Sequence, residues 1–67
     1  MTIEERIAAL EAAAASYMKK ADQQREYAFP SEATRRSHLR MASRLRERAD
    51  HLRAQLEAEH VRAETEA

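Results

Sequence analysis

Phe29-Pro30-Ser31 divides this sequence into two halves whose apolar positions mirror each other. Proline lacks a backbone N–H and disfavours a helical conformation in the residue before it, so one helix is expected to end here and another to begin. In the N-terminal half, steps of four and three residues join Ile3, Ile7, Leu10, Ala14, Tyr17, Ala21, Gln24 and Ala28. In the C-terminal half, the same steps join Ser31, Arg35, His38, Ala42, Leu45, Ala49, Leu52 and Leu56. Such heptads are typical of helices that pack along one seam.

Folding the chain back at this point brings large residues of one half opposite small residues of the other. Leu10 then faces Ala49 and Ala14 faces Leu45, as interdigitation across a close helix contact requires. With no Gly and one Pro, the chain also lacks the residues that tight β-turns need. We therefore predict an all-α fold, an antiparallel two-helix hairpin that packs like a coiled coil.

The hairpin is expected to occupy the whole chain, residues 1–67, as a single domain. Thr2 and Glu5 form a capping-box pattern at the start of the first helix, and Ser31 is suited to cap the second. The predicted elements are a first helix over 2–28, a turn over 29–31, a second helix over 31–62 and a frayed tail over 63–67. The absence of Cys excludes disulfides and thiolate metal sites.

Charged residues favour the same antiparallel register and give the hairpin an electrical polarity. The opposite charges predicted to face each other beside the seam are Glu4/Arg53, Glu11/Arg46 and Arg25/Glu32. Although the net charge of the chain is zero, residues 17–53 carry ten basic and five acidic side chains, and residues 1–16 and 54–67 are both acidic. The folded hairpin should therefore be basic towards its turn and acidic at the end that holds both termini.

A hairpin of this length buries little apolar surface, so association with a second copy or another partner is expected. Away from the seam, the first helix carries small residues where charged ones would be usual. Small side chains allow close helix contact, and we predict that they join two copies into a homodimeric four-helix bundle. The alternative is a solvated face whose alanines favour helix formation. The predicted dimer face consists of Ala8, Ala9, Ala12, Ala13, Ala15 and Ser16.

An arginine ladder follows the second helix, with one arginine every four residues from Arg36 to Arg48. Its guanidinium groups should lie about 6 Å apart. This concentration of charge predicts a protein partner with an acidic surface, including the acidic end of another copy. Nucleic acid, with its repeating phosphates, is the alternative, and a solvated face is the third interpretation. The predicted partner-binding residues are Arg35, Arg36, Arg40, Arg44, Arg48, Met18, Leu39, Met41 and Tyr27.

No catalytic constellation is recognisable, because the sequence has no Gly-rich phosphate loop and no nucleophile held beside a base. The Glu-x-x-His run over residues 57–60 has the spacing of di-metal carboxylate bundles, but it lies outside the seam. We predict no enzymatic activity, metal, cofactor or small-molecule substrate. His38 is expected to be hydrogen-bonded in the seam, and His51 to be exposed. No apolar run suits a membrane span and no signal pattern opens the chain, so a cytoplasmic protein without membrane association is expected.

The stretch Leu45-Arg46-Glu47-Arg48-Ala49-Asp50-His51-Leu52 resembles the second helix of the Rop (repressor-of-primer) family of plasmid proteins, with Leu, Ala, Asp and Leu at the same spacing. Rop chains are helical hairpins that dimerise into four-helix bundles and bind paired RNA loops through the first helix. The resemblance therefore implies a hairpin and a dimer. The RNA-contacting positions of the family correspond here to Ile3, Leu10, Ala14, Met18 and Arg25. Only Arg25 has a suitable side chain, so the resemblance does not extend to the RNA contacts.

These observations predict a small, non-enzymatic interaction or regulatory protein. It is expected to associate with itself and to bind a protein partner through its basic turn end and arginine ladder. Rop-like RNA binding through the same arginines is the alternative function. The small size suggests an accessory factor of a phage or plasmid.

Overall fold

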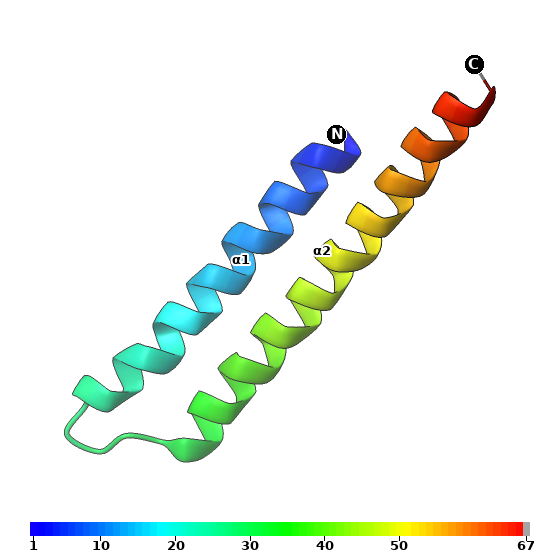
Figure 1. Cartoon of the computed structure of the whole chain (residues 1–67). Helices are drawn as coiled ribbons and strands as arrows, with labels where there is room; N and C mark the ends of the chain where they lie inside the picture. Colours follow the sequence, from blue (N-terminus) through cyan, green and yellow to red (C-terminus); the bar gives the residue numbers. More distant parts are fainter. Residues whose placement is uncertain (67) are drawn as a thin grey trace.

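The computed structural model describes residues 1–66, which form two long antiparallel helices (Figure 1). Helix α1 spans Ile3–Gln23, a 3₁₀ turn η1 spans Gln24–Glu26, and helix α2 spans Glu32–Glu66. The described residues contain no strand, and α1 packs along α2. The prediction of an all-α fold with two helices packed against each other is confirmed.

Both predicted N-terminal caps are present. The Glu5 amide donates to the Thr2 hydroxyl at 3.1 Å, and the Thr2 amide donates to the Glu5 carboxylate at 3.4 Å, which completes the capping box. At the start of α2, the Thr34 amide donates to Ser31 Oγ at 3.2 Å. Each cap satisfies amides that the first turn of a helix leaves without a partner.

The first helix ends five residues earlier than predicted, at Gln23 instead of residue 28. The chain tightens into η1 and then becomes extended at Tyr27, with φ −78° and ψ 146°. A tertiary contact accounts for this early end: Gln24 is buried, and its Oε1 accepts a hydrogen bond from the Ser31 amide at 3.1 Å. The side chain of Gln24 thus joins the end of α1 to the residue that caps α2.

The second helix is longer than predicted, because it continues to Glu66 instead of ending near residue 62. Residues 63–66 lack Pro and Gly, and Thr65 Oγ1 donates to the Val61 carbonyl at 2.9 Å. Residue 67 lies outside the described part of the chain. Since α1 has 21 residues and α2 has 35, the C-terminal part of α2 projects beyond the start of α1 (Figure 1). We call residues 57–66 the α2 extension.

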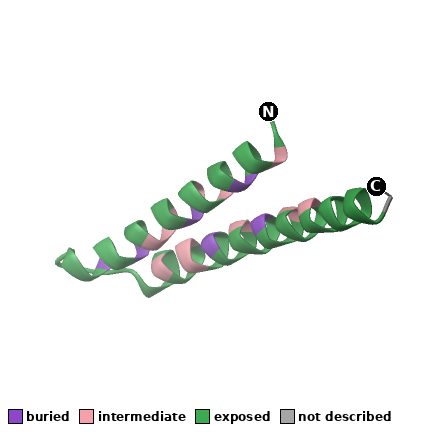
Figure 2. Ribbon diagram, turned by 45° about the horizontal axis from the view of Figure 1, so that its top comes forward, coloured by how far each residue is buried: buried purple, intermediate pink, exposed green. Residues whose placement is uncertain are grey.

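The buried residues lie on the facing sides of the two helices and all belong to the predicted heptad tracks (Figure 2). They are Ile7, Ala14, Ala21, Gln24, Ala42 and Ala49. The larger seam residues Leu10, Leu45 and Leu52 are only half-buried. Alanine lets the helices approach closely, but a leucine at the edge of a two-helix contact has nothing to cover its outer side. The predicted seam is confirmed, and it is incompletely covered.

The molecule is a thin rod, with dimensions of 60 × 17 × 14 Å and a radius of gyration of 16.5 Å. A compact domain of this length would have a radius of gyration of about 11 Å. The two short dimensions correspond to a single layer of two helices. Both flanks of the seam are therefore open to solvent or to a partner.

Within residues 1–66, the ion pair that crosses the hairpin joins Glu11 and Arg53, which differs from both predicted pairings of these residues. Helical side chains lean towards the N-terminus of their own helix. In antiparallel helices, Arg53 therefore leans towards the turn and Glu11 leans away from it, so the two meet. Near the turn, Glu32 pairs with Arg35 of the same helix, at 3.9 Å, in place of the predicted Arg25.

Candidate interaction surfaces

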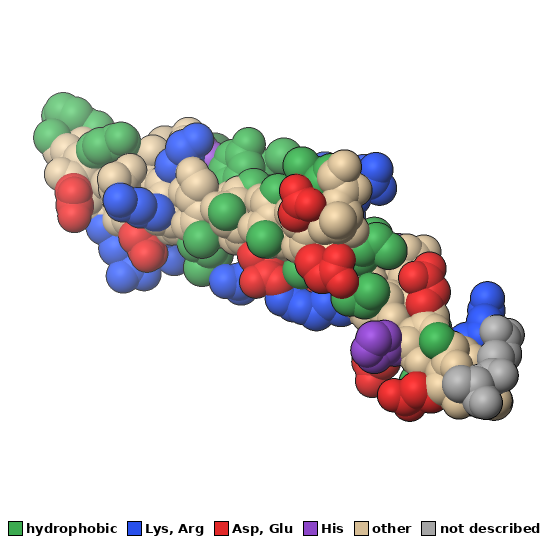
Figure 3. Space-filling model, turned by 90° about the horizontal axis from the view of Figure 1, so that it is seen from above, with side chains coloured by type: hydrophobic (Ala, Val, Ile, Leu, Met, Phe, Trp, Pro, Cys, Tyr) green, Lys and Arg blue, Asp and Glu red, His purple; other side chains and the backbone are tan. Residues whose placement is uncertain are grey.

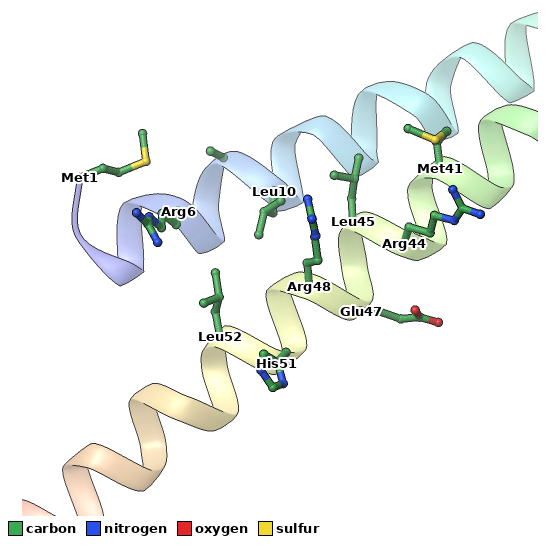
Figure 4. Close-up of a pocket in the computed structure, with 11 residues that line it drawn as sticks. Met1, Arg6, Leu10, Met41, Arg44, Leu45, Glu47, Arg48, His51 and Leu52 are labelled. Carbon is green, nitrogen blue, oxygen red and sulfur yellow. The ribbon is translucent and has the colours of Figure 1, made fainter.

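An open groove with a volume of about 930 Å³ runs along one flank of the seam (Figure 4). We call it the Leu45 groove. Leu10, Leu45 and Leu52 point into the space between the helices, so the half-buried leucines form its floor. The N-terminal segment and α1 contribute Met1, Arg6, Ala9 and Leu10. Helix α2 contributes Met41, Arg44, Leu45, Glu47, Arg48, His51 and Leu52.

Positive charge surrounds this apolar floor. Arg6 comes from α1, and Arg44 and Arg48 come from successive turns of α2. Within residues 1–66, the ion pairs use Arg35 and Arg53, and none uses the three arginines of the groove. Glu47 lies among them, so the rim has an excess of positive charge around an apolar centre. Such a surface can accept an amphipathic helix that carries acidic side chains.

The opposite flank has a different chemistry. A smaller hollow there is lined by Glu11, Ala15, Arg46, Ala49, Asp50 and Arg53. Arg53 bridges Glu11 of α1 and Asp50 of α2, the latter at 3.2 Å. Charges on this flank are thus joined by ion pairs, whereas no ion pair within residues 1–66 involves Arg6, Arg44 or Arg48 of the Leu45 groove. The charged side chains of the Leu45 groove are therefore more available to a binding partner than those of the opposite flank.

The arginine ladder does not form one straight row. Successive positions four residues apart rotate by about 40° around an α-helix, so the ladder turns by about 120° from its first member to its last. Arg44 and Arg48 line the Leu45 groove. Arg36 and Arg40 lie on earlier, exposed turns near the connection. The fifth predicted arginine, Arg35, is half-buried and paired with Glu32.

The apolar members of the predicted partner-binding set do not lie together in the structure. They are Met18, Leu39, Met41 and Tyr27. Met41 lines the Leu45 groove and is 36% exposed, whereas Met18 and Leu39 are half-buried. Leu39 and Met41 are two residues apart, which corresponds to a rotation of about 200° around α2. Their side chains therefore lie on nearly opposite sides of the helix and cannot form a single patch. Tyr27 lies in the connection between the helices and is 55% exposed.

The tip of the hairpin carries an exposed aromatic pair that the predicted site includes only in part. Phe29 is 94% exposed and lies two residues from Tyr27. Hydrophobic side chains gather at this tip, opposite the end with the acidic and His side chains of the α2 extension (Figure 3). Phe29 therefore does not close the core. The Phe-Pro sequence is the one signal that could have indicated this, because it keeps Phe29 out of a helix.

The alanine face of α1 is exposed except at Ala13, which is half-buried. Ala9 belongs to the wall of the Leu45 groove, and Ala8, Ala12, Ala15 and Ser16 lie elsewhere on the surface of α1. Ala15 lines the hollow of the opposite flank, so these small residues extend from one flank of the seam to the other. The dimer face stays a prediction.

The histidines of the seam and the groove differ in their partners. The ring of His38 lies 5.8 Å from that of Tyr17, and its buried Nδ1 has no hydrogen-bond partner among the described residues. The hydrogen bond expected for His38 is therefore not formed through Nδ1 within residues 1–66. Tyr17 presents its ring to that of His38, and Lys20 lies over the same Tyr17 ring at 5.0 Å. His51 is exposed as predicted, contacts Gln55 at 3.4 Å and lines the Leu45 groove.

The described residues show no sign of a metal site or a membrane span. In residues 1–66, no group of three or more acidic or His side chains is arranged to hold a metal ion. The two described helices are too polar for either to span a bilayer. No protein-family model, curated protein or solved structure matches this chain.

Proposed function

We propose that this chain is a small, non-enzymatic interaction protein that associates with itself and binds an acidic protein surface through its basic face and turn end. The observation that carries the proposal is the set of ladder arginines that form no ion pair within residues 1–66. Arginines four residues apart repel one another on an isolated helix. An acidic partner would relieve this repulsion and would form charge-assisted hydrogen bonds with them.

The exposed tip supports a protein partner. Tyr27 and Phe29 lie in the connection that leads into the helix carrying Arg36 and Arg40. Aromatic residues and arginine are the types enriched at protein interfaces, where aromatic anchors contribute much of the binding energy. Phe29 exposes nearly its whole side chain, and burial against a partner would remove this apolar area from water.

Nucleic-acid binding is the alternative, and the same tip is the observation that favours it. Exposed aromatic rings beside arginines can stack on the bases of a single strand while the guanidinium groups contact phosphates. The zero net charge of the chain weakens this alternative, because non-specific nucleic-acid binding depends on a basic surface with excess positive charge.

A matched pair of charge reversals tests the proposal. Immobilised wild-type chain, Arg40→Glu and Arg62→Glu are compared for the proteins they retain from a lysate of the native host. We expect acidic proteins to bind the wild type and Arg62→Glu, and their retention to fall about tenfold on Arg40→Glu, because one charge-assisted contact becomes repulsive. Equal retention by the two variants would contradict the assigned surface.

A labelled RNA set, consisting of a single strand, a hairpin and a duplex, separates the alternative. If the chain binds nucleic acid, its affinity for one of these RNAs should fall steeply with salt and with Arg40→Glu. Retention of proteins with no salt-dependent RNA binding would favour the protein partner. The reverse result would favour the RNA-binding function.

A further inference from the structure

We infer that the acidic surface recognised by this chain belongs to a second copy of it, which pairs antiparallel with the first, Leu45 groove against Leu45 groove, so that its acidic α2 extension lies beside the basic turn half of the first copy. The inference rests on the proposed function and names the partner. It combines three observations: the surplus surface of the single chain, the separation of charge along the rod, and the position of the groove near the middle of α2.

The surface of the single chain is too large for a complete domain. The chain exposes 5452 Å² at a mass of 7.7 kDa. A compact monomer of this mass would expose about 4,300 Å². The excess, about 1,100 Å², is comparable to the 800 Å² that each partner buries in a standard interface. Pairing two grooves would cover the outer sides of Leu10, Leu45 and Leu52, which the hairpin leaves half-buried.

Charge selects the relative direction of the two copies. The α2 extension carries Glu57, Glu59 and Glu64 at one end of the rod. The other end, towards the turn, carries Lys19 and Lys20 on α1 and the first ladder arginines on α2. A parallel dimer would place like charges together at both ends. An antiparallel dimer places the acidic extension of each copy beside the basic turn half of the other.

The position of the groove allows this arrangement by a single twofold axis. Helix α2 runs from Glu32 to Glu66, and its groove residues lie between Met41 and Leu52, near the middle of the helix. An axis through the groove therefore places the C-terminal half of each α2 beside the N-terminal half of the other. The contact is self-complementary, as a closed dimer requires. Apolar floor faces apolar floor, and Glu47 is available to the arginines of the facing rim.

The oligomeric mass provides the first test, with variants at exposed positions that should not disturb the hairpin. By sedimentation equilibrium of the full chain at micromolar concentrations, we expect twice the 7.7 kDa mass for the wild type and for Ser43→Glu. Met41→Glu places a charge in the Leu45 groove and should give a monomer with unchanged helical circular dichroism. A monomeric wild type, or a Met41→Glu dimer as stable as the Ser43→Glu dimer, would overturn the inference.

The charge arrangement is tested by two substitutions that change the net charge equally. Glu59→Lys removes an acidic contact that occurs twice in the symmetric dimer, so the dissociation constant should rise about tenfold at low salt. Glu26→Lys lies in the basic half and should not weaken the dimer. Equal weakening by both would show a net-charge effect and contradict the antiparallel pairing. A monomeric wild type that still retains acidic host proteins would overturn the second copy as partner and the proposed self-association, while leaving the proposed binding of an acidic protein surface standing.

Discussion

Ala42→Asp should unfold the hairpin at room temperature. Ala42 is 1% exposed and lies in the seam where α2 contacts α1. A carboxylate there would be larger than the space available and would lose its water without gaining a cationic partner across the seam. The expected loss is about 3 kcal/mol or more, from burying an unpaired charge and from overpacking. A two-helix hairpin has little stability in reserve, so this loss should abolish most of its helical circular dichroism.

Ala54→Asp is the matched control for this substitution. Ala54 is exposed on the same helix, so the change in helix propensity is similar and no charge is buried. Its thermal unfolding midpoint should stay close to that of the wild type. If the two Asp variants unfolded at the same temperature, the close contact assigned to Ala42 would be wrong.

Ile7→Ala should cause the second-largest loss of stability. Ile7 is 8% exposed and is the largest aliphatic side chain among the buried residues of the described chain. Truncation removes apolar contacts across the seam and leaves a cavity, which together cost about 2–4 kcal/mol. The free energy of unfolding is measured by urea denaturation at one fixed protein concentration, because any self-association would contribute to it.

Val61→Ala provides the comparison for Ile7→Ala. Both changes replace a β-branched residue by alanine and so gain similar helix propensity, but Val61 is 55% exposed on the α2 extension. We expect it to leave the urea midpoint nearly unchanged. A loss equal to that of Ile7→Ala would mean that burial in the seam does not determine stability.

The seam could be predicted from the sequence because it depends on local periodicity. Steps of three and four residues place one face of each helix towards the other, and the alternation of Leu and Ala fixes the layers. The end of α1 could not be predicted in the same way. It depends on the contact between Gln24 and Ser31, which forms only once the chain has folded back.

The candidate surfaces were only partly predictable for a similar reason. The ladder arginines were recognisable from their spacing, but the rotation of an i, i+4 row separates Arg36 from Arg48. The Leu45 groove joins Arg6 and Leu10 to residues more than thirty positions away. Its composition therefore depends on the three-dimensional register. The same is true of the pairing of Glu11 with Arg53, which depends on the direction in which side chains lean.

Methionine oxidation distinguishes a Leu45 groove that is covered by a second copy from one that is open to solvent. Met41 lines the groove, and Met18, half-buried on α1, is not among its lining residues, so one molecule contains both the probe and its control. Under dilute peroxide, followed by peptide mass spectrometry, the oxidation rate of Met41 should fall severalfold as protein concentration rises, while that of Met18 stays constant. If the Met41 rate were independent of concentration in a range where Met18 is also unchanged, and the mass remained that of a monomer, the groove would be open in solution and the account would be contradicted.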